Sequence, residues 1–197
     1  MVAQREPRYI SVDEWHALDQ ANLDVKYEYI DGQIYMMSGG SLAHSRISSN
    51  TVRTLEDALG SQSCYVYNSD ASVRLSESRY LYPDVSVSCD GRDQPTTEQT
   101  QVLAPCVVVE VLSDSTEGKD RIKKAHLYHA CSTIQEYVII STRYQAVEVQ
   151  RRTGDEWTIH VFGSGDEIEL VSIGVRFPLA ALYRGTTVPE MLNVGEE

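Results

Sequence analysis

The most constraining feature of this sequence is an almost unbroken run of β-branched residues, Val107 to Leu112, which follows Pro105 and Cys106. Runs of this kind form central strands that are covered on both faces of a sheet. One carboxylate, Glu110, interrupts the run. Burying it alone would cost several kcal/mol, so an ion pair or a bound cation has to compensate its charge. A structural salt bridge and a metal ligand both remain open for Glu110.

The segments around this strand predict a mixed α/β architecture. A helix from about Lys119 to Cys131 and a strand from Glu136 to Ile140 complete a strand, helix, strand unit, which favours parallel pairing. Asp31-Gly32 and Gly154-Asp155 predict hairpins, because such dipeptides form tight turns between strands. The other expected elements are helices at 11–21 and 42–59 and strands at 27–30, 33–37, 65–73, 80–89, 146–151, 157–162 and 167–171. We therefore expect a mixed central β-sheet flanked by helices, with an N-terminal helix and hairpin.

The length of the chain predicts one domain. A chain of 197 residues can bury a sufficient core without disulfides or metals. We expect a single domain over residues 1–197, with a core at about 10–185 and frayed ends. No segment approaches the ~20 consecutive apolar residues of a membrane-spanning helix. No apolar stretch follows the positive charge near the N-terminus, so the sequence predicts a cytoplasmic protein without a secretory signal.

The cysteines show no spacing typical of a zinc or dithiol site. Cys64, Cys89, Cys106 and Cys131 are far apart in the sequence and form no Cys-x-x-Cys pair. In a reducing cytoplasm such residues remain free thiols, and free thiols are what we expect here.

The charge of the chain bears on its possible partners. With 29 acidic and 17 basic side chains the formal charge is −12, which argues against a broad phosphate-binding surface. Carboxylates are nevertheless the ligands of a divalent metal site, and an acidic protein can still approach DNA through a local basic patch.

A second carboxylate, Asp84, stands at the start of a predicted strand. It follows Pro83 and precedes the alternating run Val85 to Val87. A turn-capping role is one interpretation of this position. Alternatively, Asp84 and Glu110 on neighbouring strands share a hard cation such as Mg²⁺.

The helix after Glu110 carries three polar residues at successive i, i+4 positions: Asp120, Lys124 and Tyr128. This spacing places them on one face of the helix. An ordinary surface pair of Asp120 and Lys124 remains an alternative, and such pairs contribute only about 0.3 to 0.5 kcal/mol.

Several motifs together resemble a known family. They are Tyr82-Pro83-Asp84-Val85, Val109 to Ser113 with Ser115-Thr116, Asp120 to Lys124 with Tyr128, Glu136-Tyr137, Lys26 to Gly32, and His44. In this order, over roughly residues 10 to 185, they resemble the Uma-type putative restriction endonuclease family of the PD-(D/E)XK nuclease superfamily. The resemblance implies a restriction-endonuclease-like core.

The resemblance also implies a metal site. Asp84, Glu110 and the backbone carbonyl of Val111 are its expected ligands for one Mg²⁺ or Mn²⁺. In the wider superfamily a lysine stands two residues after the glutamate, where this chain has Leu112. The resemblance transfers that role to Lys124 on the following helix.

The remaining candidates are accessory to this site. Lys123 is the neighbouring candidate for the lysine role, and a flexible ammonium can reach one point from several backbone positions. Glu28 is either an accessory acid or an exposed strand glutamate. His44 is either a hydrogen-bonded core histidine or a proton carrier.

The function implied by the resemblance is hydrolysis of a DNA phosphodiester by a metal-dependent endonuclease, acting as a homodimer. Two other interpretations remain open: an inactive, nuclease-like binding or regulatory module, and a metal-dependent hydrolase of RNA or another phosphoester.

Overall fold

A six-stranded sheet forms the main layer of the computed structural model, which describes residues 9–22, 25–37, 39–112 and 119–190. Its strand order is β11-β10-β9-β8-β6-β3. The bounds are β3 Tyr65–Asn68, β6 Val85–Ser88, β8 Val107–Leu112, β9 Glu136–Ser141, β10 Val147–Thr153 and β11 Glu156–Phe162. The pair β8 and β9 is parallel, and the other neighbours are antiparallel. The helix α3, Lys119–Ala130, lies between the two parallel strands in the sequence, as the strand, helix, strand unit predicts.

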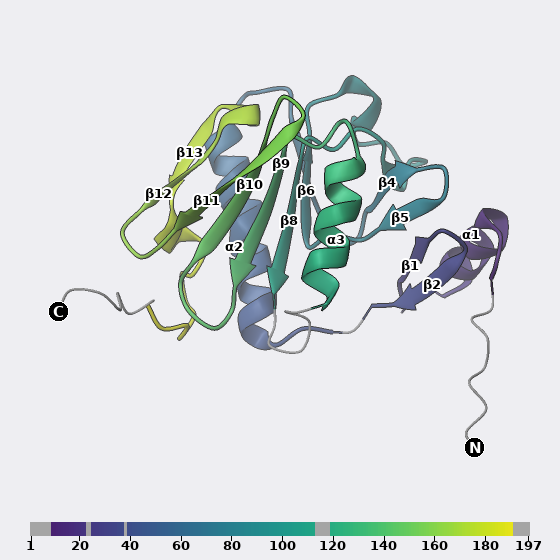
Figure 1. The fold of residues 1–197 in the computed structure, drawn as a ribbon, viewed down its shortest axis with the longest axis horizontal. Helices are drawn as coiled ribbons and strands as arrows, with labels where there is room; N and C mark the ends of the chain where they lie inside the picture. Colours follow the sequence, from purple (N-terminus) through teal and green to yellow (C-terminus); the bar gives the residue numbers. More distant parts are fainter. Residues whose placement is uncertain (1–8, 23–24, 38, 113–118, 191–197) are drawn as a thin grey trace, which may run out of the picture.

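The two faces of this sheet are covered by different helices (Figure 1). On one face, α2, Leu42–Leu59, packs Ile47 and Leu55 against Val85, Val109 and other strand residues. The strands β12, Glu167–Leu170, and β13, Val175–Pro178, form a small antiparallel sheet whose apolar residues join the same core. The opposite face is covered by α3. Glu110 therefore lies on a strand that is covered on both sides, as its sequence predicts.

A second sheet has the order β2-β1-β5-β4-β7. Its strands are β1 Tyr27–Ile30, β2 Gln33–Met36, β4 Ser72–Ser76, β5 Arg79–Leu81 and β7 Gln101–Val102. The helix α1, Val12–Ala21, begins with the capping box of Ser11 and Glu14 and packs the fully buried Trp15 against Tyr29 and Tyr80. Short 3-10 turns occur at Gly91–Asp93, Val171–Ile173 and Leu179–Ala181. No helix in the described part of the chain is long and apolar enough to cross a membrane.

The mixed sheet with an N-terminal helix and hairpin is confirmed. In the first hairpin, Asp31 and Gly32 both have positive φ angles, 50° and 89°. Two positive φ values in a two-residue turn suit the twist of the flanking strands, and Asp and Gly tolerate them best. The register Ile30↔Gln33 closes this hairpin.

Two predicted strands are wrong in extent, because turns divide each of them. The strand expected at 65–73 is split into β3 and β4 by a turn in which the backbone N–H of Asp70 donates to the Asn68 side chain, 2.9 Å. The strand expected at 80–89 is split into β5 and β6 around Pro83. Proline has no N–H to donate to a strand ladder and so interrupts it.

The expectation of four free thiols is also wrong, because Cys64 and Cys89 form a disulfide. Cys64 directly precedes β3 and Cys89 directly follows β6. These strands are antiparallel with Tyr65 opposite Ser88, so the two cysteines form the next cross-strand pair. Such pairs lie close enough to be bridged.

A buried carboxylate links the small C-terminal sheet to the main sheet. Glu136 is fully buried at the start of β9 and accepts hydrogen bonds from Arg151 Nε, 2.9 Å, and from the backbone N–H groups of Val171 and Ser172, 3.1 and 3.0 Å. The Ser172 hydroxyl donates a further bond of 2.5 Å. The carboxylate therefore has several partners that replace its lost hydration.

We expect Glu136→Ala to lower the free energy of unfolding by about 3 to 5 kcal/mol, because it leaves the Arg151 guanidinium and two amides without their acceptor. Urea denaturation measures this difference. Glu169→Ala is the matched control, because the exposed Glu169 pairs with the exposed Arg176 and its loss should change stability little. Equal destabilisation by both substitutions would contradict the structural role given to Glu136.

Candidate active site

Glu110 lies on the face of β8 that α3 covers. It is 7% exposed, and its Oε1 accepts hydrogen bonds from Lys124 Nζ, 2.9 Å, and from the Tyr128 hydroxyl, 2.6 Å. Lys124 and Tyr128 are one helical turn apart on α3, so the i, i+4 spacing brings both to the same carboxylate. An ion pair therefore compensates the buried charge in this structure.

Glu28 reaches the same ammonium from the other sheet. Its Oε1 lies 3.0 Å from Lys124 Nζ and accepts a bond from the Tyr82 backbone N–H, 3.3 Å. Glu28 is 7% exposed, so the alternative of an exposed strand glutamate is wrong. Lys124 thus bridges two buried carboxylates, one from β1 and one from β8.

Asp84 is fixed between β8 and α2. Its Oδ2 accepts a hydrogen bond from the Val111 backbone N–H, 2.7 Å, and lies 3.2 Å from His44 Nε2. His44 is in the first turn of α2, where its own backbone N–H donates to the capping Ser41 hydroxyl. The start of β6, the end of β8 and the start of α2 therefore meet at one end of the main sheet (Figure 1).

The protonation of these groups follows from burial and from their neighbours. Burial raises the pKa of Glu110 to about 7; the Lys124 ammonium opposes this shift, and the Asp84 and Glu28 carboxylates add to it. Burial lowers the pKa of Lys124, but Glu110 and Glu28 outweigh it and raise that pKa well above its usual value. Lys124 is therefore a permanent cation.

The hydrogen bond to Asp84 raises the pKa of His44, against the opposing effect of burial. The Glu110 carboxylate and a hydrogen bond with the Val111 backbone raise it further. His44 therefore contacts one of the groups predicted as metal ligands, Asp84. His44 is thus a hydrogen-bonded, partly buried histidine whose partner is Asp84, and the role of proton carrier stays a prediction.

The donor set fits a hard divalent cation. Two carboxylates and one backbone carbonyl are oxygen ligands of the kind that Mg²⁺ and Mn²⁺ prefer. Within the part of the chain that the structure describes, no three His, Cys, Asp or Glu side chains are grouped as a ready-made metal cage. Mg²⁺ does not require such a cage, because it usually keeps several waters and binds through one or two carboxylates.

The other predicted candidates are placed differently. Lys123 points to the second sheet, with Nζ 3.8 Å from the centre of the Tyr35 ring, so the geometry favours Lys124 over Lys123 as the lysine beside the carboxylates. The side chain of Asp120 lies outside the described residues. Sequence reasoning missed the backbone N–H groups of Tyr82 and Val111, which hold Glu28 and Asp84; every residue carries such a donor, so no side-chain pattern marks them.

The chain is similar to known proteins. The model of the Uma2 family, described as a putative restriction endonuclease, matches residues 12–180. The uncharacterized Synechocystis protein slr1290 is 40% identical over 81% of this chain and 84% of its own length. A second uncharacterized Synechocystis protein, sll1609, is 33% identical over 73% of this chain and 83% of its own.

A solved structure has the same fold. The crystal structure of a putative nuclease belonging to DUF820, from Anabaena variabilis, matches with a TM-score of 0.69 and 19% identity over 88% of this chain and 97% of that one. The family match covers the segments that carry Glu28, Asp84, Glu110 and Lys124. The chain belongs to the Uma2 family of putative restriction endonucleases.

Proposed function

We propose that this chain is a metal-dependent endonuclease that hydrolyses phosphodiester bonds in DNA. The observation that carries the proposal is the cluster of charged residues around Glu110. Lys124 forms ion pairs with Glu28 and Glu110, and Asp84 accepts a hydrogen bond from the backbone N–H of Val111, the residue after Glu110. Lys124 thus contacts two buried carboxylates, and burial raises the pKa of one of them, Glu110. Buried carboxylates with a shifted pKa are typical of catalytic sites.

In this proposal Asp84, Glu110 and the Val111 carbonyl hold Mg²⁺ or Mn²⁺. Such an ion, when bound, lowers the pKa of a coordinated water and neutralises charge on the phosphate. Lys124 supplies a fixed positive charge for the negative charge that develops on the phosphate oxygens, and such preorganised charge is most effective where water is excluded.

The neighbouring residues act as positioning groups. Glu28 and Tyr128 hold the Lys124 ammonium and the Glu110 carboxylate in place through bonds of 3.0 and 2.6 Å. His44 orients Asp84 from the first turn of α2. A homodimer is part of the proposal, because two-fold protein pairs commonly cut symmetric duplexes.

The first prediction concerns cleavage. We expect the purified protein to nick or cut plasmid DNA in Mg²⁺ or Mn²⁺, and expect Asp84→Asn, Glu110→Gln and Lys124→Met each to reduce the rate by about 100-fold or more, as loss of a preorganised charge does. Agarose gels of supercoiled, linear and single-stranded DNA give the rates.

Asp57→Asn is the control, because Asp57 is an exposed carboxylate on α2 whose side chain is 73% exposed. Cleavage that survives in Asp84→Asn would discredit the site. Cleavage of RNA or a small phosphoester alone would favour another hydrolase, and a folded protein that cuts no substrate would favour the inactive binding module.

The second prediction concerns metal binding and needs no substrate. We expect Mn²⁺ to raise the melting temperature of the wild type, because a ligand at 100 times its Kd stabilises the native state by about 2.7 kcal/mol. Asp84→Asn should remove this shift and Asp57→Asn should keep it. Differential scanning fluorimetry with and without metal measures the effect, and an unchanged shift in Asp84→Asn would place the ion elsewhere.

The third prediction concerns pH. In the metal-free protein Glu110 binds its proton more tightly when folded, with a pKa of about 7, than at the ordinary value of 4.5. Its contribution to stability is therefore fully present below about pH 4.5 and is lost as the pH rises through about 7.

A metal ligand must be ionised, so the stabilisation by Mn²⁺ should change in the opposite direction and grow as the pH rises through about 7. Melting curves over a pH series with and without Mn²⁺ measure both slopes. Glu110→Gln should flatten the metal-free slope in this range. A metal-induced shift that is constant across the range would show that Glu110 is not a ligand.

A further inference from the structure

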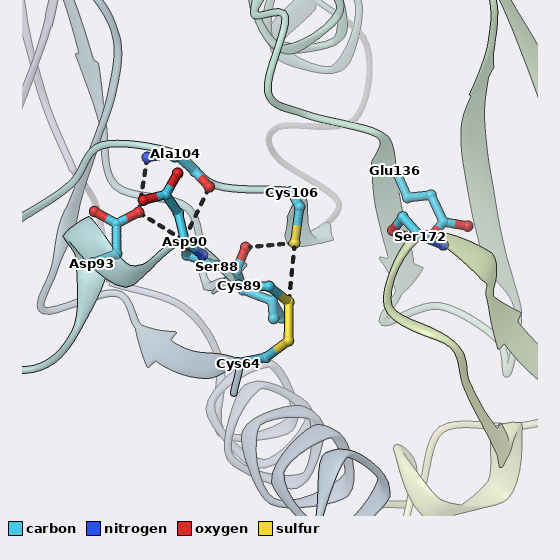
Figure 2. Close-up of a disulfide and its surroundings, with 10 residues drawn as sticks. Cys64, Ser88, Cys89, Asp90, Asp93, Ala104, Cys106, Glu136 and Ser172 are labelled. Carbon is cyan, nitrogen blue, oxygen red and sulfur yellow. Dashed lines mark hydrogen bonds between the residues drawn. A yellow bond between two sulfur atoms is a disulfide. The ribbon is translucent and has the colours of Figure 1, made fainter. Parts of the chain in front are cut away.

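Three sulfur atoms lie together at the end of the main sheet that is opposite Asp84. Cys64 and Cys89 are joined as the cross-strand pair beyond β3 and β6. Cys106 directly precedes β8, and its Sγ lies 3.9 Å from the Sγ of Cys89 (Figure 2). A free thiol is therefore in contact with one sulfur of a disulfide.

The backbone fixes this arrangement. The N–H of Cys106 donates to the Val87 carbonyl, 2.8 Å, so the residue is held beside β6 by the sheet itself. Its Sγ also lies 3.3 Å from the same carbonyl, which accepts from the thiol. The carbonyl of Cys106 accepts bonds from the N–H groups of Gln135 and Glu136, 2.8 and 3.2 Å. The thiol is thus held beside the disulfide by strands on both sides.

The fourth cysteine provides a contrast. Cys131 is buried at the end of α3, where its Sγ lies 3.3 Å from the Thr133 hydroxyl. It therefore belongs to the core, and the other three cysteines form a separate group. Cys89 is exposed and Cys64 and Cys106 are half-buried, so reagents in solution can reach this group.

We propose that Cys64, Cys89 and Cys106 form a thiol–disulfide exchange site in which Cys106 is the attacking thiol. The Cys106 thiolate attacks Sγ of Cys89, the Cys89–Cys106 bond forms, and the Cys64–Cys89 bond breaks. Cys64 leaves as a thiolate and takes up the proton that Cys106 has lost. One disulfide replaces another, so the step needs neither an oxidant nor a reductant.

The two linkages are comparable in the chain constraint that they impose. Cys64 and Cys89 are 25 residues apart, and Cys89 and Cys106 are 17 apart. The entropic effect of a disulfide varies only with the logarithm of the loop length, so these loops differ little. Loop entropy therefore gives no strong preference for either disulfide, and both can be populated.

The attacking group sets the rate of the exchange. Burial, with a smaller contribution from the Glu136 carboxylate, raises the pKa of the Cys106 thiol. The thiolate is the nucleophile in exchange, so a raised pKa makes the reaction slow near neutral pH. The exchange starts from the form that the structure shows, in which Cys64 and Cys89 are bonded and Cys106 is a free thiol.

The first test uses the wild-type protein under native conditions. The oxidised protein is treated with iodoacetamide for increasing times at about pH 8.5, near the ordinary pKa of a thiol. Its peptides are then mapped by mass spectrometry without reduction. We expect label on Cys106 in chains with the Cys64–Cys89 bond, and label on Cys64 in chains with the Cys89–Cys106 bond. The proposal would be overturned if the label were found on Cys106 alone and Cys64–Cys89 were the only disulfide at every time point.

The second test removes one sulfur at a time. Oxidised Cys64→Ser is expected to form the Cys89–Cys106 bond, whereas Cys106→Ser should retain Cys64–Cys89 and lose all label on Cys64. Cys131→Ser is the control and should behave as the wild type does. Circular dichroism melting verifies that each variant is folded.

Free thiols at both Cys89 and Cys106 in folded, oxidised Cys64→Ser would overturn the proposal, because the two residues would then be too constrained to bond. The absence of any disulfide in oxidised wild type would also overturn it. If Cys64→Ser does not fold, the labelling of the wild type decides.

Discussion

The rest of the site depends on the ion pairs of the Lys124 ammonium with Glu28 and Glu110. Glu28 belongs to one sheet and Glu110 to the other, and both contact the same nitrogen. A buried carboxylate without a partner is costly, so this cation stabilises the junction of the two sheets as well as the packing of α3 on β8. The same ammonium is the fixed positive charge that the proposed hydrolysis uses. In the function proposed above, Lys124 on α3 takes the lysine role, and it contacts both Glu28 and Glu110.

Much of the fold could be predicted because local pattern and tertiary environment agree. The run around Glu110 is continuously apolar since helices cover both faces of β8, and the i, i+4 spacing of Lys124 and Tyr128 brings both to Glu110. The hairpin at Asp31-Gly32 was predictable because few residues tolerate its two positive φ angles. In each case one local rule is enough to determine the geometry.

The features that could not be predicted depend on which strands become neighbours. The disulfide follows from the register of β3 with β6, and a separation of 25 residues reveals nothing about that register. The split of 65–73 into two strands depends on a turn in which Asn68 accepts hydrogen bonds, through its side chain from the Asp70 N–H and through its carbonyl from the Ala71 N–H, in a segment with strong strand propensity. The burial of Glu28 could not be predicted either, because a short strand with alternating residues has the same sequence pattern whether it lies at a solvated edge or inside the protein.

The direction of the two long helices has a consequence for a protein with a net charge of −12. Both α2 and α3 begin at the end of the main sheet where Asp84 and the last residues of β8 lie (Figure 1). The first turn of a helix exposes unpaired N–H groups and carries a partial positive charge of about half an elementary charge. Two such helix dipoles therefore point their positive ends toward the carboxylates. The polypeptide backbone in this way offsets part of the negative potential of the carboxylates at this end of the sheet, without any additional basic side chain.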